Sequence, residues 1–293
     1  MLINNLKRHS FPQNVIAEVV SICNLRCPIC PQKTLKRKHQ SMSMDIWEKI
    51  VDEIKAESPE TGLWPALMGE PTLLGEELLK MFTYAVKSGV KVHLNTNGNF
   101  EKEFLSSILE TGISSIYFSL DAVYQSTYDK IRRGGDINLV EDNVKLAVLN
   151  KKPHQKIFVQ FVVTEQNKNE VDNFKEFWEE FDVIVKIKPF LNWGKDSIGK
   201  INPGIDRIPC PWLLRHALII SDGRMVQCDS DYDGVYSPGD LNTQTIKEVW
   251  SGELAKRRER HWNCDFDFQP CRDCQDWSSG RAEFYKNGKQ IDV

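Results

Sequence analysis

The sequence of 293 residues has a formal net charge of −3 at pH 7, with 41% hydrophobic and 27% charged residues. This length can bury a substantial core in one large domain or in two unequal ones. The charge balance lacks the basic excess that nucleic-acid binding usually needs, so we expect no nucleic-acid partner. No stretch is apolar enough to span a membrane, and residues 1–8 are too polar for a secretory signal. We therefore expect a cytoplasmic protein without membrane contact.

Short apolar strands alternate with amphipathic helices from residue 15 to residue 187. The expected strands, many of them β-branched, cover residues 15–20, 61–67, 90–94, 115–120, 157–163 and 183–187. The expected helices cover residues 45–54, 76–87, 101–110, 137–149 and 170–181. Strands separated by helices of this length imply right-handed crossovers and a parallel α/β sheet. Six such units are too few for a closed eight-stranded barrel, which leaves an open barrel or a doubly wound sheet.

The alternating pattern breaks near residues 197–211, where glycine and proline are frequent. We place a domain boundary there, between residues 205 and 206. Beyond it, residues 217–220 and 225–227 flank a turn and predict a β-hairpin. One helix over residues 245–260 and a cysteine-bearing tail complete the expected second domain.

The eight cysteines fall into two groups. Three lie between Cys23 and Cys30, and five lie between Cys210 and Cys274. In a reducing compartment, clustered cysteines indicate metal binding or catalysis more often than disulfides. The uneven distribution therefore predicts two metal sites in two regions of the chain.

The first cysteine group directly follows the first expected strand. This places the thiols of Cys23, Cys27 and Cys30 at the carboxyl end of a parallel strand, where α/β sheets form their active sites. Three cysteines leave one iron of a [4Fe–4S] cluster free to bind another ligand. A structural zinc site is the alternative, and it requires a fourth ligand, for which His39 is a candidate.

The spacing of Cys23, Cys27 and Cys30 after a strand resembles the signature of the radical S-adenosylmethionine (SAM) superfamily, although Ile29 stands where the family usually has an aromatic residue. The resemblance implies a partial (β/α)6 barrel and a [4Fe–4S] cluster whose open iron binds SAM. One electron then cleaves SAM, and a 5′-deoxyadenosyl radical abstracts hydrogen from the substrate. An electron donor such as flavodoxin or ferredoxin would be a partner.

Further segments resemble the SAM-binding regions of the family. Gly69 and Glu70, after the second expected strand, match the motif that receives the SAM amino group, with Met68 in place of the usual first glycine. Four more residues match segments that contact SAM or supply a cation for its carboxylate, namely Asn97, Ser119, Arg132 and Arg133. An ordinary turn is the structural alternative for Asn97, and a surface salt bridge is the alternative for each of the two arginines.

The second cysteine group has its own pattern. Cys210 and Cys228 bracket the expected hairpin, and Cys271 and Cys274 form a Cys-x2-Cys pair. A hairpin and a short loop can bring these four thiols together, and the spacing by itself is compatible with either zinc or a [4Fe–4S] cluster.

The spacing from Cys210 to Cys228 resembles the opening of the SPASM extension of radical SAM enzymes. No cysteine follows Cys274, so the resemblance is to the shortened, single-cluster form called a twitch domain. It implies a radical SAM partial barrel over residues 1–205 and a small α+β twitch domain over residues 206–293. The auxiliary [4Fe–4S] cluster would be held by the four cysteines named above, with Cys264 as a non-ligand.

Twitch enzymes include dehydrogenases of the 2-deoxy-scyllo-inosamine type. The resemblance implies that a small-molecule substrate, the secondary alcohol of a sugar, aminocyclitol or similar polyol, is oxidised with the auxiliary cluster as electron acceptor. Asp229 and Asp231 are candidate proton acceptors, with solvation of the hairpin end as the alternative; His216 and His261 are weaker candidates. A SPASM-type maturase that crosslinks or epimerises a ribosomal peptide is the alternative function, and a non-catalytic cluster-binding module is a third.

Overall fold

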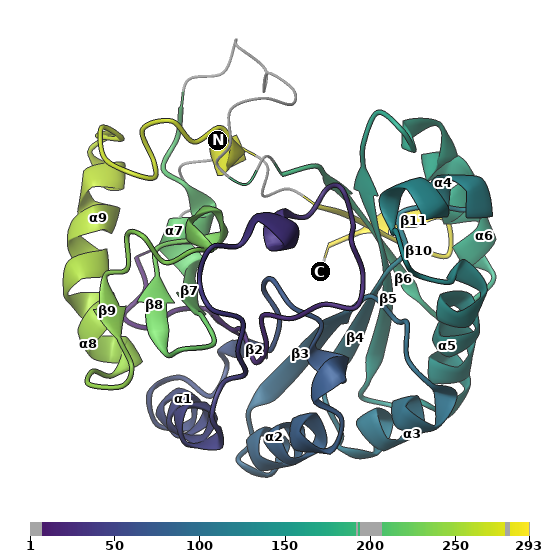
Figure 1. Cartoon of the computed structure of the whole chain (residues 1–293), viewed down its shortest axis with the longest axis horizontal. Coiled ribbons are helices and arrows are strands. Elements are labelled where there is room, and N and C mark those ends of the chain that lie inside the picture. Colours follow the sequence, from purple (N-terminus) through teal and green to yellow (C-terminus); the bar gives the residue numbers. More distant parts are fainter. Residues whose placement is uncertain (1–7, 192, 194–206, 279–281, 293) are drawn as a thin grey trace.

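The predicted alternation of strands and helices is present and builds a curved parallel sheet (Figure 1). The structure, a computed structural model, describes residues 8–191, 193, 207–278 and 282–292. The six barrel strands are β1 (Asn14–Ala17), β2 (Gly62–Trp64), β3 (Lys91–Thr96), β4 (Ser115–Ser119), β5 (Lys156–Val163) and β6 (Ile184–Pro189). They pair in parallel in sequence order. A doubly wound sheet would reverse that order, so the doubly wound alternative is wrong and the open partial barrel is confirmed.

Helices cover the outer face of this sheet (Figure 1). They are α1 (Met44–Glu57), α2 (Glu76–Lys87), α3 (Lys102–Glu110), α4 (Gln125–Ile131), α5 (Ile137–Asn150) and α6 (Val171–Glu179). In α1, the Ser43 hydroxyl accepts a hydrogen bond from the Ile46 N–H, and Trp47 is fully buried against the core. Helix α4 is not predicted from the sequence, because its two turns are too short to show a helical period. No helix in the described part of the chain is long and apolar enough to cross a membrane.

The C-terminal region extends the barrel sheet at both edges. Its elements are α7 (Pro211–Arg215), β7 (His216–Ile219), β8 (Arg224–Val226), β9 (Gly239–Asp240), α8 (Ile246–Ser251), α9 (Glu253–Trp262), β10 (Glu283–Lys286) and β11 (Lys289–Ile291). The predicted hairpin is β7–β8, and β7 also pairs in parallel with β1. At the other edge, β10 pairs antiparallel with β6 and continues into β11, a hairpin that the sequence analysis does not predict. The predicted boundary between residues 205 and 206 lies outside the described residues.

The single helix predicted over residues 245–260 is wrong, because the chain breaks it into α8 and α9 at Gly252. Gly252 has a ψ of −107°, well outside the helical range. A Cβ there would lie 2.6 Å from the Glu248 carbonyl oxygen, so only glycine fits this break. A capping box between Thr245 and Glu248 starts α8.

Aromatic side chains fill the interior of the barrel towards the amino ends of its strands. Tyr117 on β4 stacks on Phe158 on β5 at a centroid distance of 4.0 Å. Trp64 on β2 packs against Tyr117 at 5.1 Å, and Phe284 from the added strand β10 meets Phe158 edge-on at 6.4 Å. Because this end is filled, a binding cavity inside the barrel is restricted to the carboxyl ends of the strands.

Glu18, directly after β1, joins three loops at that carboxyl end. Its carboxylate forms a 2.5 Å ion pair with Arg37 of the cysteine loop. It also accepts hydrogen bonds from the Met68 N–H, in the loop after β2, and from the Ser221 N–H, in the β7–β8 turn. Glu18 is 0% exposed, so all of these bonds form away from water. This carboxylate fixes the C-terminal region against the barrel.

We expect Glu18→Ala to lower the free energy of unfolding by about 3–5 kcal/mol, because the mutation leaves the Arg37 guanidinium buried without its counterion. Urea unfolding of the two proteins measures this difference. The control is Glu60→Ala, which removes the exposed ion pair between Glu60 and Lys91 and should cost at most about 1 kcal/mol. Equal losses in the two variants would contradict a joining role for Glu18.

Candidate functional site

The first three cysteines lie in the loop after β1, at the carboxyl end of the sheet. The Cys30 N–H donates to the Cys27 carbonyl oxygen at 3.1 Å, which closes the loop into a tight turn. Cys23, Cys27 and Cys30 line one cavity, and their thiols act electrostatically on one another. Burial raises the pKa of all three thiols, that of Cys30 to about 11. Binding of iron therefore has to supply the free energy that holds them as thiolates.

Glu70 connects the loops that follow β2 and β3. Its Oε1 accepts three hydrogen bonds, from the Thr72 N–H, the Thr72 hydroxyl and the Thr96 hydroxyl. Its Oε2 accepts one, from the Asn97 N–H at 2.7 Å. Burial raises the pKa of this carboxyl, and these donors oppose the rise. Oε2 accepts one hydrogen bond where Oε1 accepts three, so Oε2 is the oxygen with room for a further donor, such as an ammonium group.

Gly69 allows the loop after β2 to lie directly on the cysteine loop. A Cβ at this position would sit 2.0 Å from the Val20 carbonyl oxygen and 2.8 Å from that of Ile22. The next residue, Glu70, donates its N–H to the same Ile22 oxygen at 2.8 Å. Both contacts are with backbone atoms, which cannot move aside as a flexible side chain can.

We expect Gly69→Ala to lower the free energy of unfolding by about 3 kcal/mol or more, because its methyl group would overlap the Val20 backbone. Gly89→Ala is the matched control, because its methyl group meets nothing within 4 Å although its φ is 86°. The control should therefore lose only about 1–2 kcal/mol of backbone energy. Thermal unfolding of both proteins measures the difference, and a greater loss for Gly89→Ala would count against the contact.

The four other predicted SAM contacts occupy different positions. Asn97 is buried and donates from its side chain to Asn24 Oδ1 at 2.7 Å, within 3.9 Å of Cys23 Sγ. Arg132 forms a 2.5 Å ion pair with Asp121 and reaches to 4.0 Å from Cys27 Sγ. Asn97, Ser119 and Arg132 line one cavity, whereas Arg133 is exposed and does not line it.

This cavity, of about 240 Å³, brings the two halves of the chain together. Cys23, Cys27 and Cys30 line it on one side, and Asp229 of the C-terminal region lines it on another. Trp193 also lines it and donates from its indole N–H to the Ile29 carbonyl oxygen at 3.1 Å. The predicted SAM contacts and a predicted proton acceptor therefore share one space.

Lys188 is a cavity residue that the sequence analysis does not identify. It lies on β6, where Lys186 and Lys188 alternate with the buried Val185 and Ile187. This alternation places both lysines on the inner face of the barrel, and it is the signal in the sequence that could have revealed them. Burial lowers the pKa of Lys188, while the carboxylates of Asp121 and Asp229 oppose that shift.

The two predicted proton acceptors differ in their contacts. Asp231 accepts hydrogen bonds from the Val235 and Tyr236 N–H groups, and it does not line the cavity. These bonds hold the turn after β8, and at 3% exposure Asp231 does not solvate the hairpin end as the alternative had it. Asp229 lines the cavity, and burial, helped by nearby Asp276, raises its pKa to about 6. Of the two aspartates, only Asp229 is positioned to face a substrate there.

The four C-terminal cysteines converge from three elements. Cys210 precedes α7, Cys228 follows β8, and Cys271 and Cys274 share one loop. The thiol of Cys228 interacts electrostatically with the other three, and burial raises the pKa of all four. Cys264 is exposed and has no interaction with this group among the contacts of the described residues.

A [4Fe–4S] cluster fits both cysteine groups better than zinc. In the described part of the chain, no three His, Cys, Asp or Glu side chains are grouped closely enough to hold one metal ion. Zinc draws its four ligands to within about 2.3 Å of a single centre. A cluster of four irons separates its cysteines around a larger body. The separation of the cysteines suits a cluster with the thiols as its ligands.

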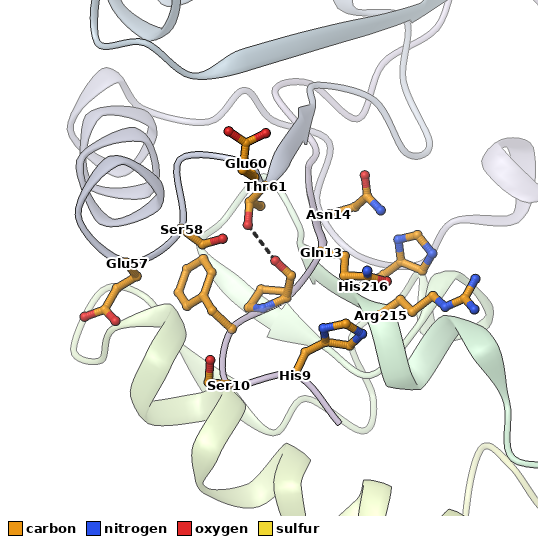
Figure 2. Close-up of a pocket in the computed structure, with 12 residues that line it drawn as sticks. His9, Ser10, Gln13, Asn14, Glu57, Ser58, Glu60, Thr61, Arg215 and His216 are labelled. Carbon is orange, nitrogen blue, oxygen red and sulfur yellow. Dashed lines mark hydrogen bonds between the residues drawn. The ribbon is translucent and has the colours of Figure 1, made fainter. Parts of the chain in front are cut away.

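A larger hollow, of about 550 Å³, lies at the opposite ends of the strands (Figure 2). His9, Asn14, Thr61 and His216 are among its lining residues. The Thr61 hydroxyl donates to the Pro12 carbonyl oxygen at 2.7 Å and ties the starts of β1 and β2 together. No cysteine lines this hollow, and parallel sheets form active sites at the carboxyl ends of their strands. His216, a weaker catalytic candidate, is on this side and does not face the cysteine cavity.

Comparisons with known proteins agree with this geometry. Residues 18–177 match the model of the radical SAM superfamily, and residues 210–275 match that of SPASM, an iron–sulfur cluster-binding domain. The GTP 3′,8-cyclase of Lactiplantibacillus plantarum is 28% identical over 196 residues, which are 61% of this chain and 57% of that relative. This chain thus spans less than two thirds of that relative's length.

Two solved structures are similar in fold. BtrN, crystallised with AdoMet and 2-DOIA, has a TM-score of 0.66 and 18% identity, covering 92% of this chain and 94% of BtrN. SuiB of Streptococcus suis, bound to the precursor peptide SuiA, has a TM-score of 0.72 and 14% identity, covering 88% of this chain and 69% of SuiB.

The chain belongs to the radical SAM superfamily. It is an enzyme of radical chemistry that uses a [4Fe–4S] cluster and SAM, and its C-terminal region is a SPASM-type domain for an auxiliary iron–sulfur cluster. The predicted family, enzyme class and cofactors are confirmed.

Proposed function

We propose that this enzyme is a radical SAM dehydrogenase that oxidises a secondary alcohol of a sugar, aminocyclitol or similar polyol. The observation that carries the proposal is the position of Asp229. It lines the same cavity as Cys23, Cys27 and Cys30, and it is adjacent in sequence to Cys228. A substrate in this cavity would touch Asp229 and lie close to the auxiliary cluster. The similarity in fold to BtrN, crystallised with 2-DOIA, supports this choice.

The residues of the barrel hold SAM in this proposal. Cys23, Cys27 and Cys30 bind the first cluster, which when loaded with SAM supplies the 5′-deoxyadenosyl radical. Glu70 Oε2 and the adjacent Gly69 segment receive the SAM ammonium group. Three polar side chains complete the SAM site, namely Asn97, Ser119 and Arg132. Arg132 supplies the cation for the SAM carboxylate. Arg133 is exposed, and we do not assign it to the SAM site.

The oxidation balances through groups of the C-terminal domain. The 5′-deoxyadenosyl radical would take a hydrogen atom from the substrate carbon to give 5′-deoxyadenosine. Asp229 would accept the hydroxyl proton of the remaining ketyl radical, and the auxiliary cluster, when bound, would accept its electron, which balances the formation of a ketone. We propose Cys210, Cys228, Cys271 and Cys274 as ligands of that cluster, with Cys264 outside it. Lys188 lies beside Asp229 and would contact the substrate oxygens.

Two further assignments follow from this proposal. We assign residues 1–205 to the barrel and residues 206–293 to the twitch domain, although strands of the second region pair with both edges of the barrel sheet. A flavodoxin or ferredoxin would supply electrons, and reduced clusters require a reducing compartment, so we place the enzyme in the cytoplasm.

The test is anaerobic turnover of the reconstituted protein with SAM, dithionite and a panel of polyols, aminocyclitols and short peptides. A ketone and 5′-deoxyadenosine should form in equal amounts, and deuterium at the carbinol carbon should appear in 5′-deoxyadenosine. Consumption of SAM without any two-electron-oxidised alcohol would refute the proposal. Modification of a peptide in the panel would favour the maturase alternative, which the similarity in fold to SuiB keeps open.

A further inference from the structure

Two buried side chains approach the sulfur of Cys271 outside the substrate cavity. His261, near the end of α9, has its Nε2 3.2 Å from Cys271 Sγ. Gln227, directly after β8, has its Nε2 2.9 Å from the same sulfur. His261 is 0% exposed and Gln227 is 1% exposed, so water does not compete for either contact. Neither side chain takes part in the reaction steps proposed above.

The direction of the His261 hydrogen bond follows from the other nitrogen of its ring. The Cys210 backbone N–H donates to His261 Nδ1 at 3.1 Å. A backbone N–H group can only donate, so Nδ1 is the acceptor and the ring proton is on Nε2. The Nε2–H therefore donates to the Cys271 sulfur.

The orientation of the Gln227 amide is fixed in the same manner. Arg257 Nη1 lies 2.9 Å from Gln227 Oε1. A guanidinium can only donate, so the amide oxygen faces Arg257 and the NH2 group faces the sulfur. Arg257 also donates to the Tyr236 carbonyl oxygen at 2.7 Å, which holds it in place. The direction of both hydrogen bonds to Cys271 is therefore fixed by neighbouring groups that can only donate, the Cys210 N–H and the Arg257 guanidinium.

The other sulfurs receive hydrogen bonds of a different kind. The Cys210 sulfur accepts from backbone N–H groups of Trp212 and Leu213, at the start of α7. The Cys274 sulfur accepts from the Asp276 backbone N–H at 3.3 Å. Backbone donors follow from the path of the chain, whereas the two donors to Cys271 depend on the identity of their side chains.

We propose that His261 and Gln227 raise the reduction potential of the auxiliary cluster and so equip it to accept an electron. Hydrogen bonds to a ligating sulfur stabilise the form of the cluster with more negative charge, which is the reduced form. Both are positioning residues, because they act through Cys271. The statement that the electron comes from the substrate rests on the proposed function. The effect of His261 and Gln227 on the reduction potential does not.

The test is a redox titration followed by EPR, in a full-length background with Cys23, Cys27 and Cys30 all changed to alanine. Only the auxiliary cluster then contributes a signal. We expect His261→Phe and Gln227→Leu each to lower the equilibrium constant for one-electron reduction about tenfold, which corresponds to about 59 mV. The matched control is Gln269→Leu, since Gln269 donates to Asp273 and to no sulfur. The reduction potential of the cluster in the Gln269→Leu variant should equal that of the background protein.

Iron content separates a shift in potential from loss of the cluster. An unchanged potential in both variants, with about four irons per chain retained, overturns the proposal. A second measurement needs no variant: ENDOR of the reduced cluster in protein labelled with 15N-histidine should show coupling to one histidine nitrogen. Absence of that coupling also overturns the proposal. This measurement remains possible if His261→Phe does not bind iron. Neither experiment uses substrate, so failure of alcohol oxidation leaves both results valid.

Discussion

Cys27→Ala should reduce formation of 5′-deoxyadenosine from SAM at least about 1,000-fold, because two thiols are too few to hold the SAM-binding cluster. Cys27 is one of three thiols that act electrostatically on one another and line the same cavity. Anaerobic incubation with SAM and dithionite, followed by chromatography of the nucleosides, measures the loss. Iron should fall from about eight to about four per chain as the auxiliary cluster remains.

Cys264→Ala is the matched control for this substitution. Cys264 is exposed, whereas the other seven cysteines are buried or half-buried, so its loss should leave iron content and SAM cleavage unchanged. Retention of SAM cleavage by Cys27→Ala would contradict the assignment of the first site. A drop to about four irons in Cys264→Ala would instead place that residue among the auxiliary ligands.

Asp229→Asn should lower the rate of alcohol oxidation about 10²–10⁴-fold, the usual contribution of a positioned proton acceptor. The amide keeps the size of the side chain but cannot take the hydroxyl proton. SAM cleavage without substrate should be unaffected, since the SAM contacts come from the barrel. Single-turnover formation of the ketone measures the effect, with the iron content checked because Cys228 is adjacent.

Asp231→Asn is the matched control two residues away. Asp231 accepts the Val235 and Tyr236 N–H groups and does not line the cavity, so this variant should lose stability and keep its rate per folded molecule. Equal losses of rate in the two variants would remove Asp229 from its proposed role. In that case Lys188, which lies beside it in the cavity, becomes the group to test.

Local patterns predict most of the barrel. The spacing of apolar residues places α2 over Glu76–Lys87 with the bounds that the structure shows, and it finds all six barrel strands. The same patterns miss the β10–β11 hairpin, whose strands are short and only partly buried. Gly252 breaks a helix that periodicity alone continues, because the break depends on the conformation of one residue.

The cysteine spacing predicts two metal sites, and its resemblance to the radical SAM and SPASM patterns implies that they are iron–sulfur sites. Cys23, Cys27 and Cys30 are close because they share one loop, whereas the ligands of the second site meet only when three elements pack together. Sequence distance does not show which of Asp229 and Asp231 faces the substrate cavity. The difference between the two aspartates depends on how the turn after β8 packs. There the backbone N–H groups of Val235 and Tyr236 donate hydrogen bonds to Asp231.

The chain's own sequence indicated the class of chemistry, because three thiols after a strand and four more near the C-terminus predict two metal sites and resemble the radical SAM and SPASM patterns, which imply iron–sulfur clusters. Tertiary structure decided which distant groups meet: Lys188 beside Asp229 in the cavity, and His261 and Gln227 at the Cys271 sulfur. The physical reason is that strand order and register determine which loops converge at one end of a sheet, and neither is encoded in any short segment.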